Sequence, residues 1–585
     1  MNQAETTNKR APARTKRRLC PNAPGAAQRL AALLLCLVAF PLQAQTPDTA
    51  AREIQRQQER ERALQERLDP RPDVRLPAGR TPPPDRLPAT ESPCFTIREI
   101  RLDDPSGRFA WALDAADPED DPATGRCLGA QGINRVMARI QNAIIEHGYV
   151  TTRVLAENQD LTAGRLTLKI LPGRLRAIRP NTDPDARLTV WNALPASPGD
   201  ILNLRDLEQA LENWKRLSTV EADIRIAPGG EPGESDLILD WKQAFPIRLT
   251  LSANDGGSKT TGRYQGSLTV SAENFLALND LLYLTLNHDL GGGKLGEYGT
   301  RGKVIHYSMP VGYWMLAATG SEHRYRQTVA GASQDYLYSG VSETAEIKLS
   351  RLIHRNAAHK STIWLRGYLT RSRNAIDGVE ITVQRRRMAG WEAGIQHRAF
   401  LANGGTLDME LAWRKGSGAF SALRAPEDAF GEGTARPKIV TAQATLSLPL
   451  RLLGQTLRYD GHWRAQWNRT PLVAQDRFSI GGRYTVRGYD GESVLMAERG
   501  YLIRNEISLP FADKRQEAYA GIDHGRVGGR TAELLVGRSL TGAVLGVRGH
   551  WKGISYDLFA GRPIRRPSAF KTDSVTAGFN LTMSY

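Results

Sequence analysis

The sequence predicts a mainly β protein, in which a transmembrane β-barrel of about 16 strands follows a helix and two small α/β modules. Residues 244–585 alternate apolar and polar side chains with a period of two, and turn residues separate the alternating stretches. Residues 94–243 contain two successive patterns of strand and helix. The chain has no apolar run of about 18 residues, the minimum for a membrane-crossing helix. These observations favour strands over helices as the membrane-spanning elements.

The first 44 residues have the features of a secretory signal peptide. A basic stretch that ends at Arg29 precedes the apolar run Leu30–Phe40, and a short segment up to Ala44 follows. This order is typical of a cleaved signal, and the apolar run is too short for a membrane anchor. We expect cleavage after Ala44 and export across an inner membrane. Because residues 1–44 carry seven Lys or Arg and one Asp or Glu, cleavage lowers the net charge from +16 to +10.

Neither the positive charge nor any motif indicates an enzyme or a nucleic-acid-binding protein. The basic residues are spread over predicted strands and loops, without a basic helix, and a mixed-charge barrel lumen explains them better. The glycine-rich stretch Gly291–Leu295 lacks the spacing of a phosphate-binding loop, and no nucleophile elbow or zinc-protease helix occurs. We expect no catalytic residues, no cofactor, no metal site and no nucleic-acid partner.

Residues 45–68 are predicted to form a helix without a wide apolar face. Alternating charges such as Arg52 and Glu53 fill this segment, and few of its residues are apolar. Such a helix needs a wet environment, and the simplest interpretation is a solvated helix or a partly disordered tail. Residues 69–93 contain eight prolines and are predicted to form an extended linker.

Residues 94–172 and 173–243 are predicted to form two α/β modules. In the first, an opening strand around Phe95–Leu102 precedes an amphipathic helix at Ile133–His147 and two closing strands. In the second, Asn203 is the expected helix cap, and a hairpin follows the helix. A small sheet with an open edge can add an extended strand from another chain. We therefore expect these modules to bind another polypeptide, and the alternative is that they only hold the barrel at a distance from another component.

Cys94 and Cys127 are the two cysteines that remain after Cys20 and Cys36 leave with the signal peptide. An exported protein reaches an oxidising compartment, so we predict a disulfide between Cys94 and Cys127. Two independent buried thiols are the alternative. Neither residue has the His or Cys neighbours that a zinc site requires.

Residues 244–585 have the length and the alternation of a closed barrel. At about 21 residues for each strand and its connection, this stretch provides about 16 strands. A soluble β-propeller is the competing architecture, but no blade-length repeat occurs. The chain ends on an alternating strand whose apolar residues would face lipid, and an ordinary edge strand would leave them exposed to water. They are Val575, Ala577, Phe579, Leu581, Met583 and Tyr585.

A glycine-rich segment, Gly481–Gly491, contains Arg487 between Val486 and Gly488-Tyr489. Its glycines allow tight turns, so the segment can fold back into the barrel. An arginine that leaves bulk water needs a carboxylate, and a carboxylate can accept two parallel hydrogen bonds from it.

Asp523 is the candidate partner of Arg487. Tyr519, Gly521, Asp523 and Gly525 share one strand face by parity, and the small glycines leave room for the loop. The alternative is that Arg487 is one more solvated arginine in a pore.

These motifs resemble those of the two-partner secretion transporters, the TpsB family, which exports haemolysins, filamentous adhesins and contact-dependent toxins. The loop motif Val486, Arg487, Gly488 and Tyr489 and the wall motif around Asp523 carry the resemblance. Tyr519 stands where the family often has Phe, which leaves the charge pairing undisturbed. Further similar segments are Asn254–Ser258, Thr261–Tyr264, Asn279–Asp280 and Gly561–Pro563.

The resemblance implies a domain order and a function. Residues 45–68 would plug the barrel, residues 94–172 and 173–243 would be periplasmic POTRA domains, and residues 244–585 would be the outer-membrane barrel. Phe579, Leu581, Met583 and Tyr585 would form the recognition strand for the barrel assembly machinery. Arg487 and Asp523 would hold the loop in a transport-competent position.

The implied partners are a large secreted TpsA-type exoprotein and outer-membrane lipid. With no nucleotide site in the sequence, export would be driven by client folding outside or by capture that biases diffusion. The alternatives are an insertase for other barrels, from the same superfamily, and a passive porin or surface adhesin. An insertase would carry a longer POTRA array, and a porin would lack binding modules.

Overall fold

The computed structural model describes residues 46–68, 72–77, 86–183, 187–452, 454–512 and 515–585. The predicted signal peptide, residues 1–44, lies outside these ranges. The chain from Asp48 onward forms one unit, and the contacts described below lie within it. No helix in the described ranges has the length and apolar character needed to cross a membrane.

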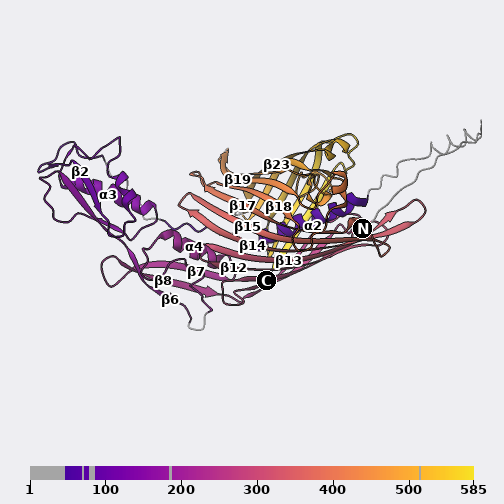
Figure 1. Ribbon diagram of the computed structural model, residues 1–585, viewed down its shortest axis with the longest axis horizontal. Helices are drawn as coiled ribbons and strands as arrows, with labels where there is room; N and C mark the ends of the chain where they lie inside the picture. Colours follow the sequence, from indigo (N-terminus) through magenta and orange to yellow (C-terminus); the bar gives the residue numbers. More distant parts are fainter. Residues whose placement is uncertain (1–45, 69–71, 78–85, 184–186, 453, 513–514) are drawn as a thin grey trace, which may run out of the picture. The chain divides into compact units, whose positions relative to one another are not determined.

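Sixteen antiparallel strands close into a barrel, as the sequence predicts (Figure 1). Neighbours in sequence are neighbours in the ring, and β27 closes it against β9 through five residue pairs. The strands are β9 (Ile247–Asn254), β10 (Gln265–Glu273), β11 (Leu281–Asp289), β12 (Tyr298–Val311), β13 (Trp314–Ala330), β14 (Asp335–Arg355), β15 (His359–Ile376), β17 (Arg386–Phe400), β18 (Thr406–Ser417), β19 (Lys438–Leu452), β20 (Gln455–Asn468), β23 (Arg499–Phe511), β24 (Gln516–Gly528), β25 (Ser539–Trp551), β26 (Ile554–Arg565) and β27 (Thr576–Ser584).

Short strands and 3₁₀ turns lie in the connections between the barrel strands. β16 (Val379–Glu380) pairs with β15, while β21 (Phe478–Ile480) and β22 (Leu495–Ala497) form a ribbon of their own. The described ranges contain five 3₁₀ turns, one in the first module and four in barrel connections: η1 (Ala110–Ala115), η2 (Thr382–Gln384), η3 (Pro426–Phe430), η4 (Ala474–Asp476) and η5 (Thr531–Leu534).

The alternation of the sequence explains the two faces of the barrel wall. In β9, Leu249 and Leu251 are exposed on the outside, whereas Thr250 between them is buried toward the lumen. At the end of the chain, the backbone of Tyr585 exchanges hydrogen bonds of 2.9 and 3.0 Å with Leu249. The terminal residue therefore extends the β27–β9 seam by one more pair.

The first module contains a three-stranded sheet with the order β2-β5-β4 and one helix. The predicted opening strand is in fact two strands, because β1 pairs with β3 whereas β2 pairs with β5. The chain changes partner at fully buried Ile97. The elements are β1 (Phe95–Thr96), β2 (Glu99–Asp103), β3 (Cys127–Leu128), α3 (Ala130–Glu146), β4 (Arg153–Leu155) and β5 (Arg165–Leu171).

The end of the predicted linker belongs to this module. Leu87 is buried in the module core, and its N–H donates to Asp121 at 2.8 Å. Glu91 accepts from the backbone of Gly129, Gln131 and Gly132 at the start of α3. The proline-rich composition therefore overstates the length of the free linker, because single apolar and acidic residues within it dock onto the folded module.

The second module follows the same plan with the sheet order β6-β8-β7. The predicted cap is present, since the Asn203 side chain accepts from the Arg205 N–H at 2.8 Å. Trp214 lies in the centre of the core and is 1% exposed. The elements are β6 (Arg174–Asn181), α4 (Leu204–Lys215), β7 (Val220–Pro228) and β8 (Glu234–Gln243).

Cys94 and Cys127 are bonded to each other in the first module, with 5.3 Å between their Cα atoms. We expect thiol-reactive labels to modify neither residue in the purified protein before reduction and both after it, as read by mass spectrometry. Replacing both residues by Ala should destabilise the first module by roughly 3 to 4 kcal/mol, because the bridge closes a loop of 33 residues. Labelling of either thiol without reductant would contradict the bridge in solution.

Candidate functional site

The loop between β21 and β22 carries Arg487. Val486 is fully buried in an apolar cluster with Ile480 and Leu540. The Tyr489 hydroxyl lies 3.0 Å from the carbonyl oxygen of Thr541 and 2.9 Å from that of Arg565. The residues on both sides of Arg487 thus hold the loop against the barrel wall.

Arg487 meets Asp523 of β24 through three hydrogen bonds. Its Nε donates to Oδ2 at 2.8 Å, its Nη2 donates to Oδ1 at 2.9 Å, and its backbone N–H donates to Oδ2 at 2.9 Å. Asp523 is 0% exposed and Arg487 is 7% exposed. The side-chain contacts have the two-pronged geometry of a strong charge-assisted pair.

Glu506 of β23 is a second anion at this site, which the sequence reasoning missed. It accepts from Arg487 Nη1, and its other oxygen lies 2.7 Å from Arg548 Nη1. Burial alone would lower the pKa of Arg487, but hydrogen bonds and charges from Asp523 and Glu506 outweigh it and raise that pKa. The guanidinium therefore stays charged.

Two glycines make room for the loop. Gly488 has φ +91°, and a Cβ built on it would lie 2.5 Å from the Arg562 carbonyl oxygen. A Cβ on Gly521 would lie 2.7 Å from Arg487 Nη2. A larger residue at either position would push the loop away from the wall.

The other residues of the predicted wall motif face the same site. A Cβ on Gly525 would lie 2.9 Å from Val486, so this glycine also admits the loop. The Tyr519 hydroxyl donates to Asp557 at 2.8 Å, and the Arg548 guanidinium stacks 4.8 Å from the Tyr519 ring. The structure thus brings together the predicted loop and wall residues.

Helix α2 (Thr46–Leu68) places a buried carboxylate against the lumen wall. Glu53 is 2% exposed and lies near Arg56 (3.0 Å), Thr261 (3.2 Å) and His323 (3.7 Å). Burial acts to raise the pKa of Glu53, but His323, Arg56 and Arg60 outweigh it and hold that pKa below its usual value. The polar face that the sequence predicts is therefore buried among polar partners and not in an apolar core.

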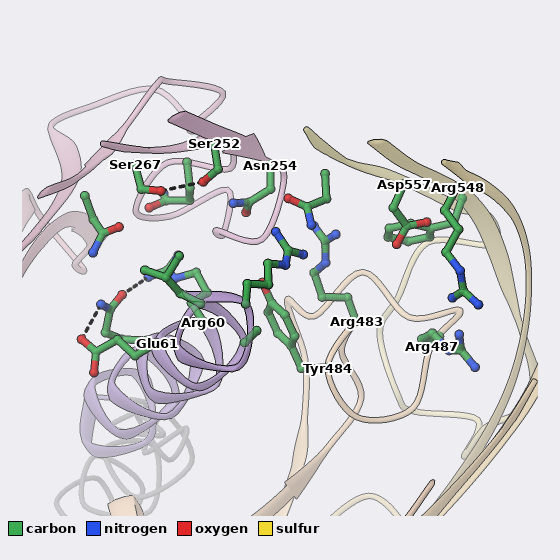
Figure 2. A pocket seen from close by; sticks show the side chains of 18 of the residues that line it. Arg60, Glu61, Ser252, Asn254, Ser267, Arg483, Tyr484, Arg487, Arg548 and Asp557 are labelled. Carbon is green, nitrogen blue, oxygen red and sulfur yellow. Dashed lines mark hydrogen bonds between the residues drawn. The ribbon is translucent and has the colours of Figure 1, made fainter. Parts of the chain in front are cut away.

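Helix α2 also binds the loop of Arg487. Arg52 Nη1 donates to the Glu492 carbonyl at 3.1 Å, and Arg56 Nη2 donates to the Gly491 carbonyl at 2.8 Å. A cavity of about 240 Å³ lies between helix, loop and wall. Figure 2 shows Arg60 and Glu61 on the helix side of this cavity and Arg483, Tyr484 and Arg487 on the loop side.

The linker segment 72–77 contacts both α4 and the barrel, and Arg355 of the barrel wall joins all three parts. The N–H groups of Val74 and Leu76 donate to Glu212 and Glu208, each at 2.9 Å. Arg355, at the end of β14, contacts both carboxylates and donates to the Val74 carbonyl at 2.7 Å. We name this cluster the Arg355 clamp.

The remaining predicted site residues lie elsewhere. Phe579, Leu581 and Met583 belong to β27, next to Tyr585 at the seam. Phe579 is tied to the loop as well, because its carbonyl accepts from Arg483 Nη2 at 3.3 Å.

Known proteins share this architecture. Residues 233–549 match the family described as haemolysin secretion/activation protein ShlB/FhaC/HecB. Residues 95–173 match the ShlB-type POTRA domain, and residues 174–228 match a second POTRA domain.

Several relatives are similar over nearly their whole length. The outer membrane transporter CdiB-2 of Burkholderia pseudomallei (strain 1026b) is 35% identical, over 94% of this chain and 98% of the relative. The solved structure of CdiB from Acinetobacter baumannii is 30% identical, with a TM-score of 0.80, over 93% of this chain and 100% of the other. CdiB from Escherichia coli, 24% identical with a TM-score of 0.83 over 92% and 99% of the two chains, shares the fold.

The closed barrel, the POTRA domains and these relatives together place the protein in the outer membrane, with its POTRA domains in the periplasm. The family match covers more than half of the chain. The chain therefore belongs to the ShlB/FhaC/HecB family of haemolysin secretion/activation proteins, the two-partner secretion transporters.

Proposed function

We propose that this protein exports a large partner exoprotein from the periplasm to the cell surface. Its POTRA domains recognise the partner, the barrel conducts it, and no nucleotide is hydrolysed. The observation that carries the proposal is the filling of the lumen by two segments, α2 and the Arg487 loop, that are held mainly by polar contacts.

The polar contacts of α2 and the Arg487 loop support the proposal that these segments leave the lumen when a client passes. An apolar plug would expose its buried surface to water on leaving, at about 25 cal/mol for each Å². The charged side chains of α2 exchange their partners for water at a smaller cost, because water hydrogen bonds replace protein ones. A passive porin would need no such removable segment.

The POTRA sheets support capture of an extended segment. Among the described strands, β7 pairs only with β8, and β4 pairs only with β5. The outer edges of β7 and β4 present backbone groups to which an extended chain can add. This mode tolerates many sequences, which suits a long and partly unfolded client.

Without nucleotide hydrolysis, folding of the client on the cell surface would make export directional. A client that folds on the cell surface cannot slide back through the pore, so thermal motion becomes directional. The relatives named as CdiB transporters, from Burkholderia pseudomallei, Dickeya dadantii and Escherichia coli, and the haemolysin transporters of Proteus mirabilis and Serratia marcescens support a contact-dependent toxin or a haemolysin as the client class.

Replacing Arg487 by Ala should strongly reduce export while leaving the barrel folded. The change removes both side-chain hydrogen bonds to fully buried Asp523 and leaves it with Arg504 at 3.8 Å, whereas Glu506 keeps Arg548. Breaking a buried ion pair from one side costs about 3 to 5 kcal/mol. The loop should then leave its position, and secreted partner protein should fall by about tenfold or more. Immunoblots of culture supernatant measure export, and heat-modifiable mobility in electrophoresis measures barrel folding.

Arg366→Ala is the matched control for this experiment. Arg366 also points into the lumen and pairs with two carboxylates, Glu346 and Glu392. Unlike Arg487, it lies on a wall strand, β15, so its ion pairs hold no loop. We expect near-normal export from it. Normal export by a folded Arg487→Ala protein would refute the role of the pinned loop, and an equal loss in both variants would attribute the effect to lumen charge in general.

Replacing Glu53 by Ala should loosen α2. Arg56, Arg60 and His323 then lose their shared anion, and the helix should spend more time outside the lumen. We expect more frequent and larger conductance steps in planar bilayers. Glu66→Ala, on an exposed part of the same helix, should behave like the unmodified protein, and unchanged conductance of Glu53→Ala would contradict the plug role.

A further inference from the structure

Six basic side chains lie together on the outside of the barrel, on β12, β13 and β15. They are Arg301, Lys303, Arg324, Arg326, Arg371 and Arg373, and we name them the basic face. All six are exposed. β12, β13, β14 and β15 are consecutive in the barrel wall (Figure 1).

The contacts of neighbouring residues fix the direction of this face. His323 Nε2 lies 3.7 Å from a carboxylate oxygen of α2, and the Tyr325 hydroxyl donates to Asn374 at 2.9 Å. These three side chains are buried toward the lumen. Because successive side chains of a strand point to opposite faces, Arg324 and Arg373 point to the lipid side.

The strand register arranges the basic face in rows. Arg301 pairs with Arg324, Arg324 with Val341, and Val341 with Arg373. With strands about 4.8 Å apart, this row spans about 14 Å from β12 to β15. The next row toward the periplasm contains Lys303, Glu322, Glu343 and Arg371.

The basic face lies at the extracellular edge of the apolar band of the barrel. At the far end of β12, the Gly312 N–H donates to the Asn192 carbonyl of the second POTRA domain at 2.7 Å, so that end is periplasmic. Arg301 lies near the opposite end of the strand. Between the two ends the outer surface is apolar, with exposed Ile305, Leu316, Ile347, Leu349, Ile363 and Leu365.

The basic face carries more positive than negative charge: Glu322 and Glu343 lie opposite Lys303 and Arg371 in the second row, and Glu380 interacts electrostatically with Arg373. Arg324 Nε lies 2.8 Å from Glu322, and Arg326 Nη1 lies 3.6 Å from Glu297. Within the described part of the chain, no side-chain hydrogen bond or ion pair joins another residue to Arg301, Lys303, Arg371 or Arg373. Like charges held this close repel one another unless an anion lies between them.

We propose that the basic face binds lipopolysaccharide, the outer-leaflet glycolipid whose sugar head group carries phosphates. Arginine binds phosphate through two parallel hydrogen bonds. One phosphate cannot reach both ends of a row of about 14 Å, whereas phosphates at the two ends of a disaccharide can. The acyl chains of the same molecule lie on the apolar residues below. The site goes beyond export, because it binds a lipid and not the client.

The test compares two double variants of the full-length folded protein in detergent. Arg301→Gln/Arg373→Gln removes the two charges at the ends of the first row of the basic face. Arg351→Gln/Lys552→Gln removes the same charge from the opposite end of the outer wall, where Arg351 stacks on Trp314 and Lys552 on Trp551. Titration with purified lipid A, followed by native mass spectrometry, should show about thirtyfold weaker binding for the first variant and less than about a twofold change for the second.

Three results would overturn the proposal. The first is equal lipid A affinity of the unmodified protein and Arg301→Gln/Arg373→Gln. The second is an equal loss in both double variants, which reflects general charge attraction. The third is binding of phosphatidylglycerol as tight as that of lipid A. Heat-modifiable mobility checks folding, and if the first variant misfolds, Lys303→Gln/Arg371→Gln replaces it with the same expected loss.

Discussion

A guanidinium that is almost completely removed from water determines the arrangement of the lumen. Arg487 has five side-chain N–H donors, and Asp523 and Glu506 supply the acceptors and the opposite charge. A small displacement of the loop would separate these charges in a low-dielectric site, so one loop position is strongly favoured. Since Arg52 and Arg56 of α2 bind carbonyl groups of the same loop, the helix position depends on this pair too.

The barrel separates two kinds of surface by strand parity alone. Leu249 and Leu251 face lipid, while Thr250 faces the lumen, and the same rule separates His323, beside α2, from Arg324 on the outside. The position of a charged residue along the strand therefore determines whether its side chain faces the lumen or the lipid. An inward charge orders the loop or the helix, whereas an outward charge at the rim meets lipid head groups.

The sequence predicts much of this arrangement because period-two alternation is local information. Parity, the need of Arg487 for a carboxylate and the family resemblance together indicate Asp523, and the resemblance places the polar helix in the lumen. Glu506 was missed because the strand register that sets it opposite Gly521 cannot be read from either strand alone. Composition overestimates the length of the free linker for a similar reason, since the docking of Leu87 and Glu91 depends on the folded surface of the first module. The split of β1 from β2 follows from tertiary pairing.

The Arg355 clamp sets a limit on how far α2 can travel. Asp73, next to Val74, is held by Lys360 at 2.9 Å and also contacts Arg398. From Leu68 to Asp73 the chain has a contour length of about 17 Å, whereas a helix of 23 residues is about 35 Å long. In the proposed export cycle, this short tether would stop the helix partway along the pore while the clamp is closed. In that cycle, full withdrawal of α2 into the periplasm would require release of the Arg355 clamp, which would couple the second POTRA domain mechanically to the helix.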